Sequence, residues 1–114
     1  MTRTPEEIFA HHGQALGAGD IDEIVADYAD DAVFITPDGA LHGKDGVRAG
    51  FTQLLSDLPN ASWDLKTRIF EGDLLFLEWA AESATTRADG VDTFVFRDGM
   101  IWAHTVRSWL QAKG

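Results

Sequence analysis

The sequence has 114 residues, 45% of them hydrophobic, and predicts a single globular domain spanning residues 1–114. A formal net charge of −10 repels nucleic-acid phosphates and anionic lipids, so neither nucleic acid nor a membrane is an expected partner. The absence of cysteine excludes disulfides and thiolate chemistry, and the N-terminus has no apolar signal segment, so we expect a cytoplasmic protein.

Two helices are predicted at the start of the chain. The first begins at Pro5 after the capping residue Thr4 and ends at Gly17-Ala18-Gly19. The second follows Asp20 and is predicted to end at the acidic pair Asp30-Asp31. Its apolar face shows helical spacing and consists of Ile21, Ile24, Val25 and Tyr28.

The middle of the chain predicts two short strands and a third helix. The strands, over residues 32–36 and 40–43, flank a turn at Pro37-Asp38-Gly39. The third helix ends at Pro59, and its apolar residues at helical spacing are Val47, Phe51, Leu54, Leu55 and Leu58.

From Trp63 onward the apolar period changes to two, which predicts strands over residues 63–70 and 74–86. Asp89-Gly90 is then predicted to turn the chain into a hairpin over residues 91–110, whose own turn contains Asp98-Gly99. Helices mostly first and strands afterwards indicate the α+β class: a curved antiparallel sheet with about three helices covering one face.

The hairpin turn has two possible lengths, which place Asp92 differently. With a two-residue loop, Asp92 lies opposite Thr105 and His104 points to the other face of the sheet. With a three-residue loop, Asp92 lies opposite His104. We favour the longer loop because it gathers one apolar face, made of Phe94, Phe96, Met100, Trp102 and Val106.

Asp92 is the first candidate for acid–base chemistry. It precedes Phe94 and Phe96 on one strand face, so its carboxyl group is expected to point into apolar surroundings. Burial disfavours the charged form of a carboxyl group, which makes it a usable acid or base near neutral pH. The alternatives are a carboxylate satisfied by local N–H groups or solvent, and a His104 that is only hydrogen-bonded within the sheet.

Three segments carry a resemblance to a known family. They are D-I-D-E-I-V-A-D-Y-A-D-D-A-V-F-I-T-P-D-G at 20–39, H-G-K-D-G-V at 42–47 and V-D-T-F-V-F-R-D-G-M-I-W-A-H at 91–104. In this order they resemble the nuclear transport factor 2-like superfamily, in particular its SnoaL-like and ketosteroid-isomerase-like branch. The resemblance implies a cone-shaped α+β barrel, a deep apolar pocket between sheet and helices, and frequently a homodimer across the outer sheet face.

The same resemblance implies roles for four residues. Asp92 matches the inward carboxyl group of the isomerases and the acid/base aspartate of SnoaL-like cyclases, and a histidine at the place of His104 is common among SnoaL-like proteins. His12 matches a tyrosine that donates to the substrate oxygen, although a lone histidine on an apolar stripe is more often a satisfied core residue. Thr36 replaces the proton-shuttling aspartate, so ketosteroid isomerisation by that mechanism is not expected.

Other polar residues give weaker indications. Glu78 is expected on the solvent or dimer face, because Leu77 and Trp79 alternate with it; an inward Glu78 would be a second carboxyl group beside Asp92. Arg68 is the one strand candidate for an epoxide-hydrolase-like Asp-Arg-Asp unit, and its spacing gives no support. His11 and His12 point about 100° apart on a helix and cannot chelate together, so no metal or other cofactor is expected.

The expected function is therefore cofactor-free acid–base chemistry on a small apolar carbonyl-type ligand: isomerisation, cyclisation, dehydration or hydrolysis. Asp92 would act as acid and base, with His104 and His12 assisting. The residues expected to bind the ligand are Tyr28, Thr36, Trp63, Trp79, Phe94, Phe96 and Trp102. A non-catalytic ligand-binding or dimerisation module of the same fold is the alternative.

Overall fold

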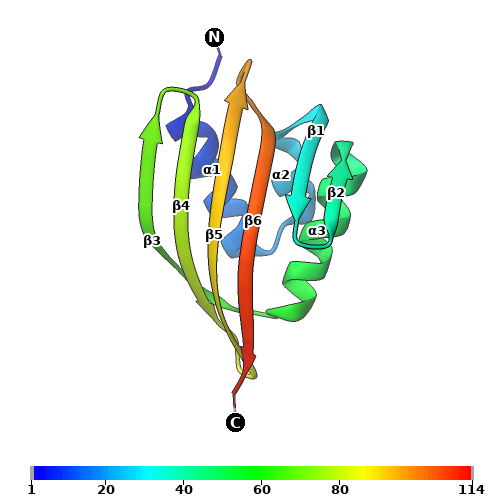
Figure 1. Cartoon of the computed structure of the whole chain (residues 1–114), viewed down its shortest axis with the longest axis vertical. Coiled ribbons are helices and arrows are strands. Elements are labelled where there is room, and N and C mark those ends of the chain that lie inside the picture. Colours follow the sequence, from blue (N-terminus) through cyan, green and yellow to red (C-terminus); the bar gives the residue numbers. More distant parts are fainter. Residues whose placement is uncertain (1, 114) are drawn as a thin grey trace.

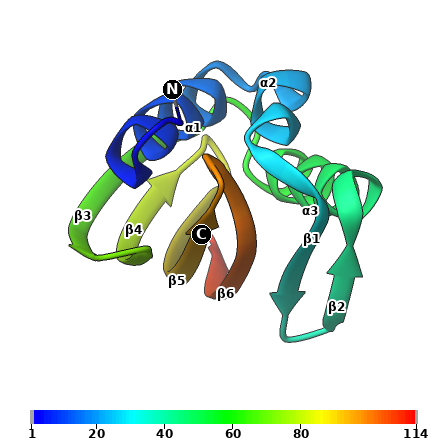
Figure 2. The same ribbon diagram turned by 90° about the horizontal axis from the view of Figure 1, so that it is seen from above.

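The computed structural model describes residues 2–113. The helices are α1 (Pro5–Ala18), α2 (Ile21–Ala26) and α3 (Gly43–Asp57). The strands are β1 (Tyr28–Thr36), β2 (Gly39–His42), β3 (Ser62–Glu71), β4 (Leu74–Glu82), β5 (Thr86–Arg97) and β6 (Met100–Ala112). All six strands form one curved, unclosed sheet in the order β2-β1-β6-β5-β4-β3, and the helices lie against its concave face (Figures 1 and 2). The predicted α+β class is confirmed.

The first helix follows the sequence prediction. The Thr4 side chain accepts a hydrogen bond from the Glu7 backbone N–H, and the Glu7 side chain accepts one from the Thr4 backbone N–H. At the other end Gly19 adopts a left-handed φ of 67°, which glycine tolerates without a steric cost. α1 is thereby fixed at both ends, and it holds His12 on its buried face.

The second helix is shorter than predicted, because Tyr28 begins a strand instead of closing a helical face. The reason is a set of contacts that are distant in sequence. The buried Asp27 carboxylate accepts a hydrogen bond from the Arg3 guanidinium at 2.8 Å, and its second oxygen lies 2.7 Å from His11 Nδ1. Lys44 donates to the Val25 and Tyr28 carbonyl oxygens, which satisfies backbone groups at the helix end.

The sheet departs from an all-antiparallel arrangement at one pair, since β1 and β6 run parallel. A second correction concerns Asp89-Gly90, which lies inside β5 and makes no turn. The turn between β4 and β5 is at residues 83–85, where the Ser83 hydroxyl accepts from the Thr85 and Thr86 N–H groups. Gly90 lies opposite Trp79, and a side chain at Gly90 would overlap the indole ring.

The β5–β6 hairpin also differs from the favoured register. Its loop is the two-residue turn Asp98-Gly99, with φ angles of 55° and 75° as a type I′ turn requires. A bulge then leaves Trp102 without a partner, because Phe96 pairs with Ile101 and Val95 pairs with Ala103. The bulge moves the rest of β6 by one residue, so His104 returns to the face that carries Asp92.

The core lies between the concave sheet face and the helices. On β4, Leu75, Leu77 and Trp79 are buried while Glu78 is exposed, which confirms the expected facing of this strand. Within residues 2–113, no helix is both long and apolar enough to cross a bilayer.

Candidate active site

A cavity of about 1080 Å³ separates the helices from the concave side of the sheet. Its size lies just above the range of about 300–1,000 Å³ that is usual for small-molecule sites. Most of its wall is apolar. The aromatic residues of the wall are Phe9, Phe34, Phe51, Trp63, Trp79 and Phe94.

Asp92 and His104 meet in the floor of this cavity. Phe94 lies directly opposite His104 and Asp92 opposite Val106, so the carboxyl group of Asp92 reaches diagonally across the two strands. Asp92 Oδ2 lies 2.6 Å from His104 Nε2, and the two residues are only 6% and 2% exposed. Both partners are shielded from water, so this short hydrogen bond lies in a low-dielectric site, where a hydrogen bond is electrostatically stronger than in water.

His104 is held by the strands on both sides of β6. It pairs with Phe34 on β1 and with Phe94 on β5. The imidazole consequently stacks between two phenyl rings, with centroid distances of 4.4 Å to Phe34 and 3.9 Å to Phe94. This arrangement leaves only the edge of the imidazole free for polar contacts.

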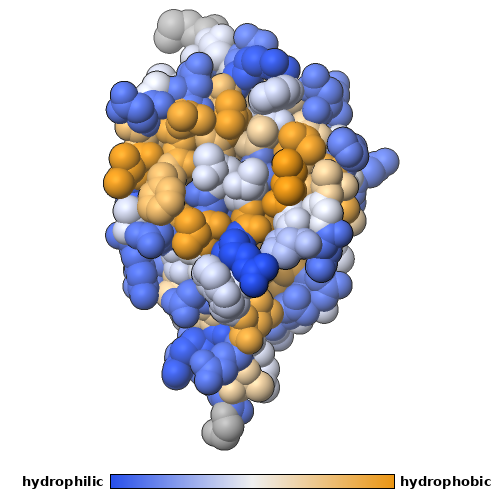
Figure 3. Space-filling view, in the orientation of Figure 1, coloured by the Kyte–Doolittle hydropathy of each residue, from blue (hydrophilic) through white to orange (hydrophobic). Residues whose placement is uncertain are grey.

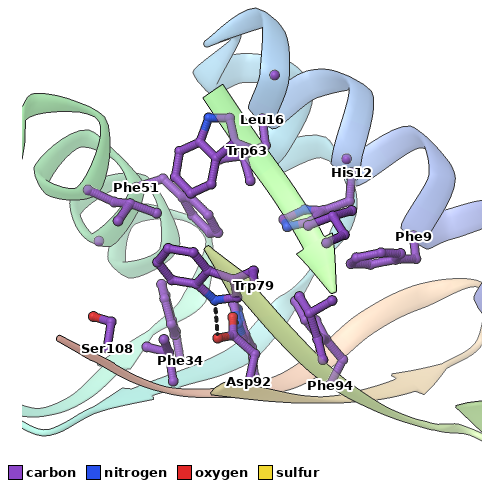
Figure 4. Close-up of a pocket in the computed structure, with 18 of the residues that line it drawn as sticks. Phe9, His12, Leu16, Phe34, Phe51, Trp63, Trp79, Asp92, Phe94 and Ser108 are labelled. Atoms are coloured by element: carbon purple, nitrogen blue, oxygen red, sulfur yellow. Dashed lines mark hydrogen bonds and ion pairs between the residues drawn. The ribbon is translucent and has the colours of Figure 1, made fainter. Parts of the chain in front are cut away.

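Two further groups extend the pair into a buried chain of hydrogen bonds. The Trp79 indole N–H donates to Asp92 Oδ1 at 2.8 Å, drawn as a dashed line in Figure 4. The Tyr28 hydroxyl lies 2.8 Å from His104 Nδ1. Burial, with the Asp92 and Asp27 carboxylates adding, raises the pKa of Tyr28 well above its usual range, so its hydroxyl keeps a proton to donate. When Tyr28 donates to Nδ1, the Nε2 proton of His104 faces Asp92, which suits an ionised carboxylate.

His12 faces the same cavity from α1, across from β5 (Figure 4). Its burial, with His104 and His11 adding, lowers its pKa from 6.5 to about 3, so the ring is neutral at physiological pH. Its Nδ1 atom is buried and has no hydrogen-bond partner within residues 2–113. An orphaned buried N–H costs more than an orphaned lone pair, so we infer that the proton sits on Nε2.

The predicted site residues fall into two groups. Asp92, His104 and His12 line the cavity, as do Thr36, Trp63, Trp79 and Phe94. The Thr36 hydroxyl lies 3.1 Å from the Asp38 backbone N–H, from which it accepts a hydrogen bond, and thereby belongs to the adjoining turn.

Tyr28, Phe96 and Trp102 do not line the cavity, which corrects their prediction as ligand contacts. Tyr28 lies behind His104, and Phe96 packs behind Phe94 in the core. Trp102 is the bulged residue, and its ring lies under the guanidinium of Arg97.

Some cavity residues were missing from the predicted set. Three phenylalanines form part of the cavity wall: Phe9, Phe34 and Phe51. In the sequence, only their spacing on the apolar faces of one strand and two helices indicated that they are buried. Arg68 also lines the cavity, because a register shift on β3 after Leu65 brings its side chain to the inner face. A bulge of this kind has no signature in the spacing of the sequence.

The profile of the SnoaL-like domain matches residues 9–104. The chain belongs to the SnoaL-like domain family. No curated protein matches this SnoaL-like chain.

Solved structures share the fold of this SnoaL-like domain at low sequence identity. IdmH, a proposed polyketide cyclase from Streptomyces antibioticus, is 18% identical over 93% of this chain and 92% of its own, with a TM-score of 0.77. The epoxide hydrolase/cyclase-like enzyme SalBIII, which has a role in pyran ring formation in the polyether salinomycin, is 18% identical over 96% and 95%, with a TM-score of 0.81. An NTF-2 like protein of unknown function from Burkholderia xenovorans LB400 is 27% identical over 91% and 81%, with a TM-score of 0.76.

Proposed function

We propose that this SnoaL-like domain binds a small apolar carbonyl compound and transfers a proton beside its carbonyl group without a cofactor. Isomerisation, aldol-type cyclisation and elimination of water beta to a carbonyl group can all begin with such a step. The observation that carries the proposal is the buried Asp92–His104 hydrogen bond of 2.6 Å in the floor of an aromatic cavity. The similarity in fold to cyclase-like enzymes supports it.

Asp92 is the proposed base. Its carboxylate accepts from the Trp79 indole and from His104, and these two donors stabilise the ionised form that can remove a proton. The carbon acid loses its proton to Asp92, and the electron pair moves to the carbonyl oxygen as an enolate forms. His104 holds the carboxylate in place, and Tyr28 holds His104.

His12 is the proposed donor to the developing oxyanion. Its ring lies 6.5 Å from that of His104, centroid to centroid and perpendicular to it, so a ligand that lies in the cavity beside these two rings can contact both residues. A neutral imidazole can offer Nε2–H to an enolate oxygen without placing a charge in the apolar cavity. The base and the donor then act on the same carbonyl compound, Asp92 at its α-carbon and His12 at its oxygen.

The test is deuterium exchange at the α-carbon of apolar ketones such as 2-tetralone, followed by NMR in D₂O. We expect accelerated exchange with the native protein and a loss of about 10²-fold or more in Asp92→Asn, the usual contribution of a positioned acid or base. Asp89→Asn is the matched control, because Asp89 is exposed on the same strand. Equal exchange rates for the native protein and Asp92→Asn would refute the assignment of Asp92.

A non-catalytic binding module is the second candidate, and one observation favours it. The ring nitrogens of His104 and the carboxylate oxygens of Asp92 all have protein partners already. In that case 2-tetralone binds in the cavity, and its exchange rate stays at the value in buffer.

Homodimerisation through the outer sheet face also belongs to this proposal. Paired residues across five strands form an uncharged outer row there: Ile69, Phe76, Thr93, Thr105 and Ile35. Figure 3 shows hydrophobic residues gathered on the upper half of this face. A second copy of the chain would cover them in an isologous contact. The cytoplasmic location stays a prediction.

A further inference from the structure

Arg68 lies on the inner face of the sheet in the same row as Asp92. It pairs with Leu77 on β4, and Leu77 pairs with Asp92 on β5. Two strand spacings of about 4.8 Å therefore separate the Arg68 and Asp92 backbones, close to 10 Å in all. Because Arg68 lines the cavity and is itself exposed, its guanidinium belongs to the rim of the site, and Asp92 to its floor.

Arg68 is also without a partner among residues 2–113, which is unusual in a chain with 19 acidic and 9 basic residues. The other basic side chains of this part of the chain are engaged by carboxylates, backbone carbonyl groups or an aromatic ring: Arg3, Lys44, Arg48, Lys66, Arg87, Arg97, Arg107 and Lys113. Two acidic residues that line the cavity accept hydrogen bonds from groups other than Arg68: Glu7 from the Thr4 backbone N–H and Asp57 from the Gln53 side chain.

We propose that Arg68 binds a carboxylate of the ligand, so that the site takes an apolar carbonyl compound whose acid group lies at the rim while its reacting carbon lies at the floor. The inference rests on the proposed function and names its substrate class. A monoanion fits better than a phosphate dianion, because a single guanidinium faces the cavity while Glu7 and Asp57 also line it.

The experiment compares two ligands of the same shape, 1-pyrenebutanoate and 1-pyrenebutanamide, by calorimetric titration at low salt. The amide measures occupation of the cavity alone, and the difference between the two measures the recognition of charge. We expect the native protein to prefer the acid by roughly fivefold, the upper value for a solvent-exposed ion pair. Arg68→Gln should bind both ligands with the affinity that the native protein shows for the amide.

The control is Arg107→Gln, which removes the same charge from an exposed residue on the opposite face of the sheet. It should keep the preference for the acid. An acid preference that survives in Arg68→Gln, or that disappears equally in Arg107→Gln, would overturn the role of Arg68. Since these titrations measure no proton transfer, a failed exchange reaction with intact acid preference would overturn only the catalytic proposal. Binding of neither ligand to the native protein would overturn the role of Arg68, and the exchange reaction would still decide the catalytic proposal.

Discussion

At the scale of single residues, His12 has the clearest dependence on pH. Its pKa is about 3 in the folded protein, compared with an ordinary value of 6.5, because burial penalises the imidazolium. Between these two values the unfolded chain binds a proton that the folded protein does not, so stability falls as pH is lowered. At a pH of about 5 the protonation of His12 in the unfolded chain lowers the free energy of unfolding by about 2 kcal/mol relative to neutral pH.

His12→Leu should therefore remove about 2 kcal/mol of the acid-induced loss of stability at a pH of about 5. The measurement is the free energy of unfolding in urea at several pH values, for the native protein and the variant. His42→Gln is the control, because His42 is exposed. Parallel curves for the native protein and His12→Leu would contradict the burial of a neutral imidazole.

The identities of the polar site residues could be predicted from the sequence, but their partners could not. Asp92 and His104 were identifiable because they stand on a strongly alternating hairpin. The Trp79 and Tyr28 contacts bridge 13 and 76 residues along the chain, and only the assembled sheet brings those side chains together. The spacing of Tyr28 from Ile21 and Val25 predicts that it continues the second helix. The helix ends before Tyr28 because Arg3 and His11, which are distant in sequence, hold the buried Asp27 carboxylate at that point.

At the scale of the elements, the β5–β6 hairpin shows why register resists prediction. The favoured three-residue loop and the observed turn with its Trp102 bulge both bring Asp92 and His104 to one face, through different residues. The observed pairing instead buries Ile101 and leaves Trp102 outside the cavity. Asp-Gly is a reliable signal at 98–99, where both φ angles are positive, and it misleads at 89–90, inside a strand.

Gly90 makes no turn but leaves space for the Trp79 indole ring, and a substitution can test this role. Its missing side chain lets the Trp79 indole lie on β5 and donate to Asp92. Gly90→Ala should displace the ring and cost at least about 1–3 kcal/mol, as overpacking does. Urea unfolding gives the cost, and the NMR resonance of the Trp79 indole proton reports the lost hydrogen bond.

Gly13→Ala is the matched control, since a side chain there meets nothing within 4 Å in α1. It should stabilise the helix by up to about 1 kcal/mol. An unchanged Trp79 indole resonance in Gly90→Ala would show that the hydrogen bond from Trp79 to Asp92 does not depend on a glycine at position 90.

At the scale of the whole molecule, the proposed homodimer would form through the outer sheet face. Ile69, Phe76 and Ile35 are 58%, 41% and 43% exposed in one uncharged row, which a single chain leaves in water. Phe76→Asp should convert a dimer into monomers, because the substitution buries an unpaired charge in the contact. Sedimentation equilibrium measures the mass.

Ala49→Asp is the control for this change, as it adds the same charge to an exposed position on α3. The variant should sediment like the native protein. A native protein that sediments as a monomer at about 100 µM, or a dimer that survives in Phe76→Asp, would refute this interface.

The strand order has a consequence for how the chain folds during synthesis. β6 lies between β1 and β5, yet it is the last of the six strands to leave the ribosome. Until residues 100–112 emerge, β1 and β2 cannot join the β3–β5 meander, and Phe34 and Phe94 lack the histidine that they enclose. The contacts that define the site are thus of high contact order and form late, which favours slow folding and exposes a nascent chain to chaperones.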